Sequence, residues 1–176
     1  MDPLLAARRL PKLAERAMRT AIARSLISRR LTPRALVDRA LVMFERSVAR
    51  QLGDGVRPAL LFAERDRILQ ELRAFMASPL AARLTVLPHS AILAGRDAAP
   101  YDVLVRSGHG KVYAIVFRRL PRGGARLELF RRMMGAKTET RTPVAGVLAY
   151  DFSRATARVL LDQAGAQGVN CDLRAS

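Results

Sequence analysis

The chain has 176 residues and carries 31 lysines and arginines against 15 acidic residues, a formal net charge of +16. Half of its residues are hydrophobic, which argues against intrinsic disorder because disordered chains combine high charge with low hydrophobicity. The single cysteine, Cys171, excludes an internal disulfide and a multi-cysteine zinc site, and charges interrupt every apolar run before a membrane helix could form. We therefore expect a folded protein of a reducing compartment, the cytoplasm, with no transmembrane insertion.

Three helices are predicted in the first half of the chain. Residues 3–30 repeat apolar residues at helical spacing, and Pro11 is expected to begin or kink this helix. Thr32-Pro33 is a helix start signal, and apolar residues then recur every four positions up to Gly53-Asp54-Gly55. Residues 58–77 form the third helix, which Ser78-Pro79 ends. The arginine-rich start also resembles an organellar transit peptide, in which Asp2 and Glu15 would be unusual.

The second half changes to short apolar or β-rich runs bounded by turn residues, with one further helical segment at Ala125–Lys137. Ser107-Gly108-His109-Gly110 has the chemistry of a hairpin turn, so the runs on either side of it should pair antiparallel. Val144–Tyr150 lacks polar side chains, as a strand buried on both faces does. The expected strands are Leu84–Leu87, Ala91–Leu93, Tyr101–Arg106, Lys111–Arg119, Val144–Tyr150 and Ala155–Leu161.

This order of elements predicts an α+β fold, in which N-terminal helices precede a mixed central sheet with flanking helices. We expect a basic helical segment at 1–55, an α/β core at 56–165 and a weakly structured tail at 166–176. The N-terminal helices are interpreted as a hairpin that packs on the core or forms a homodimer. Residues 26–39 also allow a helix-turn-helix reading.

The excess positive charge lies in two blocks, since residues 1–50 and 101–150 carry net charges of +8 and +7. Nearly all of it is arginine, whose planar guanidinium binds phosphate through two hydrogen bonds. This favours a nucleic acid as the partner. Arginine enrichment from a GC-rich genome, an anionic membrane surface and an acidic protein are the alternatives.

A helix, a strand, a hairpin, a helix and a buried strand follow one another over residues 58–161. The hairpin contains Pro100-Tyr101-Asp102-Val103-Leu104-Val105 and then Val112 to Arg118. This arrangement resembles the core of the PD-(D/E)xK, or restriction-endonuclease-like, nuclease superfamily. The resemblance implies that Asp102 and a Glu-x-Lys triplet on the next strand hold Mg²⁺ and position the attacking water.

The triplet position is occupied here by Val116-Phe117-Arg118, so the second carboxylate is replaced by valine and the lysine by arginine. We therefore expect a catalytically degenerate nuclease fold that needs no cofactor. An active, Mg²⁺-dependent nuclease with a migrated glutamate is an alternative. Its catalytic residues would be Asp102, Glu128 and Arg118, and its metal ligands Asp102, Glu128 and Glu64.

Arginine pairs are the expected phosphate-binding groups. Arg118 and Arg119 should point to opposite faces at the strand end, so one of them should face the former cleft, and Arg131 and Arg132 are expected on the helix beside the hairpin. With few aromatic residues for base stacking, backbone contacts to duplex DNA are favoured over single strands. The remaining alternative is a non-enzymatic assembly protein that binds an acidic or ribonucleoprotein partner. The candidate nucleic-acid-binding residues are Arg118, Arg119, Arg131, Arg132, Lys111, Arg29 and Arg30.

Overall fold

A computed structural model describes residues 3–86, 91–93, 101–106, 110, 112–117 and 144–162 of the chain. The chain forms two compact units, Met1–Met76 and Ala77–Ser176. The division lies later than the boundary expected after residue 55, because the third helix packs on the first two. The two units are described separately.

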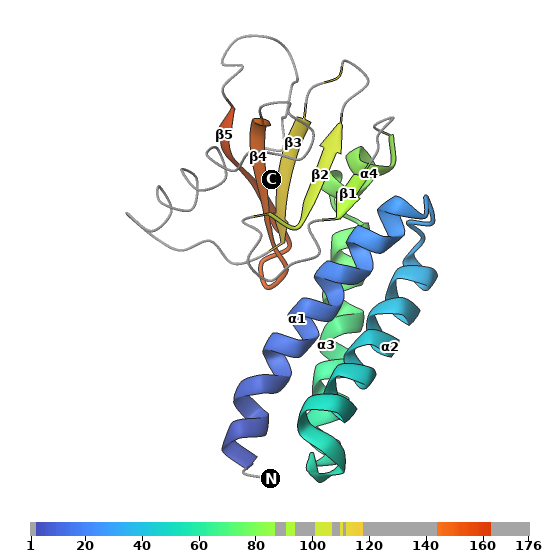
Figure 1. Cartoon of the computed structure of the whole chain (residues 1–176), viewed down its shortest axis with the longest axis vertical. Helices are drawn as coiled ribbons and strands as arrows, with labels where there is room; N and C mark the ends of the chain where they lie inside the picture. The colour runs from blue at the N-terminus through green and yellow to red at the C-terminus, as the bar shows by residue number, and fades with distance from the viewer. Residues whose placement is uncertain are drawn as a thin grey trace. The chain divides into compact units, whose positions relative to one another are not determined.

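Three helices lie side by side in the first unit (Figure 1): α1 (Pro3–Ile27), α2 (Pro33–Leu52) and α3 (Pro58–Met76). A single 3-10 turn, η1 (Gly53–Gly55), precedes the short connection to α3. The three helices predicted from the sequence are confirmed, and α1 runs through Pro11 without interruption. Since α1 and α2 pack against each other along their length, they form a helical hairpin and not the steeply crossed pair of a helix-turn-helix motif.

The ends of α2 follow the signals in the sequence. The Thr32 hydroxyl accepts a hydrogen bond from the backbone N–H of Ala35 at 3.3 Å, and Pro33 occupies the first turn, where no N–H is needed. At the other end, Gly53 adopts a φ of +65°, which favours glycine, and its N–H bonds to the carbonyl of Val48. These two caps explain why a Thr-Pro and a Gly-Asp-Gly sequence delimit this helix so closely.

The core of the helical unit is made by one apolar face from each helix. On α2 the buried residues recur every four positions, so they form a continuous stripe on one side. A fully buried leucine or phenylalanine contributes roughly 1.5–3 kcal/mol relative to exposure, and such residues dominate this interior. The largest of them are Leu10, Met18, Ile22, Leu36, Phe44, Ile68, Leu72 and Phe75.

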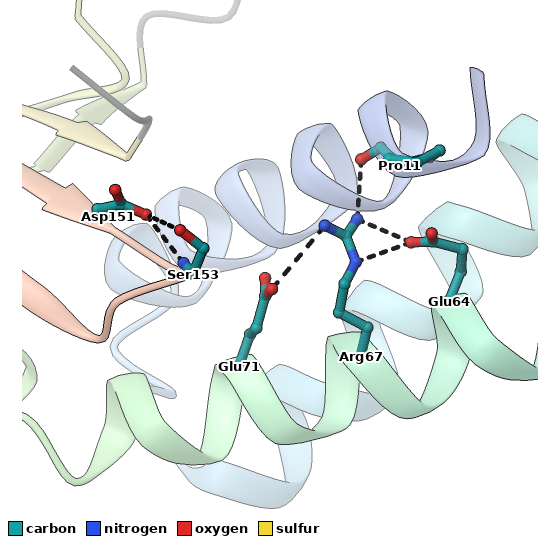
Figure 2. Close-up of polar contacts among 6 residues, drawn as sticks. All are labelled: Pro11, Glu64, Arg67, Glu71, Asp151 and Ser153. Atoms are coloured by element: carbon teal, nitrogen blue, oxygen red, sulfur yellow. Dashed lines mark hydrogen bonds and ion pairs between the residues drawn. The ribbon is translucent and has the colours of Figure 1, made fainter. Parts of the chain in front are cut away.

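A polar clamp joins α3 to α1 at the edge of this core (Figure 2). Arg67 forms an ion pair with Glu64 at 2.7 Å and a weaker one with Glu71 at 3.8 Å. The same guanidinium donates a hydrogen bond to the carbonyl oxygen of Pro11 at 3.0 Å. Both glutamate side chains are mostly buried, at 16% and 15% exposure, so Arg67 neutralises two carboxylates that water reaches poorly.

The second unit begins with a short helix, α4 (Pro79–Val86). The prediction of a strand at Leu84–Leu87 was therefore wrong for residues 84–86, and Leu87 lies outside the described residues. Ser78 starts this helix, because its hydroxyl accepts from the Ala81 N–H at 3.4 Å and Pro79 follows at the first helical position. Leu80, Ala81 and Leu84 are buried, a spacing that suits one helix face.

A five-stranded mixed sheet makes up the rest of the described second unit (Figure 1), with spatial order β1-β2-β3-β4-β5. Neighbouring strands are antiparallel except β3 and β4, which are parallel. All six residues of β3 are buried, so this strand is covered on both faces. The strands are β1 (Ala91–Leu93), β2 (Val103–Arg106), β3 (Val112–Phe117), β4 (Val144–Asp151) and β5 (Thr156–Asp162).

The α+β class, the antiparallel β2–β3 hairpin and the interior position of β4 are as predicted from the sequence. A turn joins β4 to β5, and Asp151 stabilises it by accepting from both the N–H and the hydroxyl of Ser153 (Figure 2). The helix expected at 125–137 and the tail at 166–176 lie outside the described residues.

The Arg67 clamp predicts that two ion pairs of the helical unit contribute unequally to the free energy of unfolding. Arg67→Ala should lower the free energy of unfolding by about 1–3 kcal/mol, since it removes a cation that pairs with two mostly buried carboxylates. Arg65 pairs with Glu45 at 3.4 Å in an exposed position, so Arg65→Ala should change it by less than about 1 kcal/mol. Urea denaturation followed by circular dichroism measures both, and equal effects would contradict the clamp.

Candidate functional site

Asp102, the aspartate expected at the start of the hairpin, lies immediately before β2 and is 7% exposed. Its carboxylate oxygen Oδ2 accepts a hydrogen bond from the backbone N–H of Phe117 at 2.7 Å. Its own N–H donates to the carbonyl oxygen of Ile115 at 2.9 Å. Asp102 thus continues the ladder between β2 and β3, with its side chain supplying an acceptor for the last described N–H of β3.

The two hydrogen bonds of Asp102 flank Val116, so the residue at the expected glutamate position lies directly beside the aspartate. Val116 is fully buried and offers no metal ligand. On the neighbouring position, Phe117 packs with Tyr150 of β4 and Phe152 of the following turn, at ring-centroid distances of 6.4 and 6.0 Å. The end of β3 is therefore an apolar and aromatic packing site around one carboxylate.

Within the described ranges, no three histidine, cysteine, aspartate or glutamate side chains come together as a metal-binding group. Glu64, the expected ligand from the helix before the sheet, belongs to the helical unit and has its Oε2 atom engaged by Arg67 at 2.7 Å. A carboxylate held by an arginine is a poorer ligand for a divalent cation than a free one. Glu128 lies outside the described residues.

Arg29 and Arg30 are exposed at the corner that joins α1 to α2. The N–H groups of these two residues bond to the carbonyls of Leu26 and Ser25, which closes the end of α1. Arg29 adopts a φ of +52°, a left-handed conformation that normally favours glycine and costs about 1 kcal/mol for other residues. The structure therefore brings these two predicted arginines together on the surface.

Arg39 fixes this corner from α2. Its Nη1 atom donates to the hydroxyl oxygens of Ser25 and Ser28 at 3.3 and 3.4 Å. Ser25 is fully buried, so the guanidinium satisfies a hydroxyl that water does not reach. Arg39 is thus a packing residue, whereas Arg29 and Arg30 project from the turn that it helps to hold.

The other predicted nucleic-acid-binding residues, Lys111, Arg118, Arg119, Arg131 and Arg132, lie outside the described residues. Two features were missed at the sequence level: the bond between Asp102 and the Phe117 N–H, and the clustering of Phe117, Tyr150 and Phe152. The aromatic cluster could have been predicted from the sequence, since aromatic residues occur at or just beyond the ends of two expected strands. The bond of Asp102 could not have been predicted, because the sequence does not distinguish a buried aspartate that bonds to backbone from a catalytic aspartate.

No protein-family model matches the chain, and no curated protein matches it. Among its described helices, none combines the length and the apolar character of a membrane span. The features that bear on function are therefore the geometry of Asp102, the order of the strands and the placement of positive charge.

The role of Asp102 in the β2–β3 ladder can be tested by stability. Asp102→Ala should lower the free energy of unfolding by about 1–3 kcal/mol, because the buried Phe117 N–H loses this acceptor. Asp102→Asn keeps an acceptor oxygen at the same place and should cost clearly less. Chemical denaturation of the three proteins compares them, and an alanine variant as stable as wild type would show that the bond contributes nothing.

Proposed function

We propose that this chain is a nucleic-acid-binding protein, with duplex DNA as its partner, built on a catalytically degenerate nuclease-like core. The observation that carries the proposal is the position of Val116 beside Asp102 in adjacent strands. At the place where the resemblance implies a pair of metal-binding carboxylates, one carboxylate remains and bonds to backbone. The net charge of +16 supplies the attraction to a polyanion that such a core would retain.

The strand order supports the nuclease-like core. β2 and β3 form an antiparallel hairpin, and β3 pairs in parallel with β4. A parallel pair needs a crossover connection, which is usually helical, and residues 118–143 supply the required length. This agrees with the expected helix at 125–137, which would follow the hairpin and precede the buried strand, as in the resembled superfamily.

The chemistry of the remaining residues favours binding without cleavage. Hydrolysis of a phosphodiester by a divalent cation requires ligands that fix the ion and a group that positions water. Asp102 directs one oxygen at the Phe117 N–H, and the adjacent strand residue Val116 is buried and apolar. Arginine side chains can still hold phosphate oxygens through paired hydrogen bonds, since that interaction needs no metal.

Cleavage can be tested directly. We expect no nicking of plasmid DNA in the presence of Mg²⁺ or Mn²⁺, because the second carboxylate is missing at Val116. Wild type and Asp102→Asn are compared, since asparagine preserves the backbone bond while removing the charge that a metal needs. Metal-dependent nicks that disappear in Asp102→Asn would contradict degeneracy, and loss of the same nicks in Glu128→Ala or Glu64→Ala would identify a migrated ligand.

The binding face can be tested with Arg118, Arg119, Arg131 and Arg132, which we propose to contact phosphates together. Each phosphate contact contributes about 0.9 to the slope of log affinity against log salt concentration. Replacing all four arginines by alanine should therefore flatten the slope for duplex DNA by roughly three to four units.

Fluorescence anisotropy with a labelled random-sequence duplex measures this slope. Binding with unchanged affinity and slope would remove these four arginines from the binding surface. No binding by wild type at low salt would contradict the proposed function itself and favour the assembly protein with an acidic or ribonucleoprotein partner.

A further inference from the structure

Helices α2 and α3 together present apolar side chains to solvent. Val42 on α2 and Phe62 on α3 are large apolar residues with exposures of 45% and 66%. Ala49 is also exposed, and three leucines of the two helices are only half-buried: Leu41, Leu61 and Leu69. Packing within the chain therefore leaves apolar surface of both helices in contact with water, which is the kind of surface that a partner covers.

An ion pair joins the two helices at the centre of this surface. Arg65 of α3 and Glu45 of α2 approach to 3.4 Å, and both side chains are about half exposed. Residues three or four positions apart share one face of a helix, and each of the six apolar residues lies three or four positions from Glu45 or from Arg65. The apolar residues therefore surround the ion pair. We call the ion pair and these six residues the α2–α3 face.

The charges beside the two exposed apolar residues follow opposite orders on the two helices. Three positions after the apolar residue, α2 carries an acid and α3 a base, whereas four positions after it, α2 carries a base and α3 an acid. At about 100° per residue, the third and fourth positions lie on opposite sides of the apolar residue. The third positions form the ion pair between the helices, so the fourth positions lie on the outer flanks. The residues are Val42, Glu45 and Arg46 on α2, and Phe62, Arg65 and Asp66 on α3.

Across the α2–α3 face the charges therefore alternate: basic, acidic, basic, acidic, from the Arg46 flank to the Asp66 flank. A second copy turned by 180° about an axis parallel to the helices presents the same row in reverse order. Each basic position then meets an acidic one, since Arg46 faces Asp66 of the second copy and Glu45 faces its Arg65. A two-fold axis that runs across the helices instead puts each charge opposite itself, which is repulsive.

The apolar residues also meet in the first of these arrangements. α2 and α3 run side by side in opposite directions (Figure 1), with the ion pair as their common level. From this level, Ala49 and Phe62 lie four and three positions toward one end, and Val42 and Leu69 lie three and four positions toward the other. An axis parallel to the helices keeps every residue at its own level. Phe62 of one copy therefore meets Ala49 of the other, and Val42 meets Leu69.

We propose that the α2–α3 face binds a second copy of this chain about a two-fold axis parallel to the helices. The four helices then form a bundle in which every neighbouring pair is antiparallel, as in up-and-down four-helix bundles. α2 and α3 have 20 and 19 residues and are about 30 Å long, and two helices side by side are about 20 Å wide. The dimer therefore buries about 1,200 Å² in total, at the lower end of the range for specific interfaces.

The exposed side of α1 offers no such match between two copies. Its exposed residues Arg8, Arg9 and Lys12 all carry the same charge, so two copies of this side repel each other. Leu4, at the start of the same helix, is as exposed as Phe62, at 70%. It therefore provides a matched control for a substitution on the α2–α3 face.

Sedimentation velocity of the full chain, freed of nucleic acid, measures the dimer. Wild type should form a species of twice the chain mass of 19.4 kDa. F62E places a charge against the apolar surface of the second copy and should weaken the dimer at least about 100-fold. L4E should leave the dissociation constant unchanged within about twofold. Both positions are exposed, so both variants should keep the circular dichroism spectrum and unfolding midpoint of wild type.

A charge reversal tests the orientation of the two copies. R46E and D66R each place like charges together at two symmetric positions, and each should weaken the dimer about tenfold. The double variant R46E/D66R restores opposite charges between the copies and should dimerise within about threefold of wild type. Arg46 and Asp66 lie on opposite flanks of the face in their own chain, so a pair within one chain does not explain the recovery.

A wild-type chain that stays monomeric up to about 0.1 mM overturns the inference and leaves the face to a different partner. The inference is also overturned if F62E dimerises as wild type does, if F62E and L4E weaken the dimer equally, or if R46E/D66R dimerises no better than R46E. It does not rest on the proposed function. Its failure is therefore distinct from that of the proposed function, which the binding of wild type to duplex DNA tests separately.

Discussion

The hydrogen bond from the Phe117 N–H to the Asp102 carboxylate joins the start of β2 to the end of β3. It lies beside the aromatic contacts that link β3 to β4. A buried carboxylate needs such a donor, because an ionised group removed from water is costly unless it is bonded. Asp102 therefore serves the fold through this bond.

The sequence was sufficient for elements whose signals are local. Periodic apolar residues and the caps at Thr32 and Gly53 determine the ends of α2, and turn residues such as Asp151 determine the β4–β5 hairpin. It failed at Leu84, where a short apolar run fits a strand or a helix equally well. The decisive signal there was Ser78-Pro79, which ends α3 and also caps α4.

The sequence could not predict which elements, distant along the chain, pack against each other. Nothing in the pattern of α3 says whether its apolar face meets two helices or a sheet, so the unit boundary after Met76 differs from the expected one. The candidate site illustrates the same limit. Asp102 lies at the start of the hairpin strand, as the sequence predicts, but its bond to a residue fifteen positions away follows from strand register, which only the folded sheet provides.

Charge in this protein is organised by pairing as much as by composition. A net charge of +16 attracts a polyanion, but it does not identify the surface that binds it. Several of the arginines are already engaged in ion pairs or hydrogen bonds within the fold. Arg67 neutralises two carboxylates and binds the Pro11 carbonyl, and Arg39 holds two serine hydroxyls. Arginines engaged in this way are parts of the scaffold, and a ligand would have to break their bonds to use them. In the helical unit a ligand could reach, without breaking such bonds, the exposed basic residues that make no ion pair with described residues, and these lie on α1, on α2 and on α3 alike.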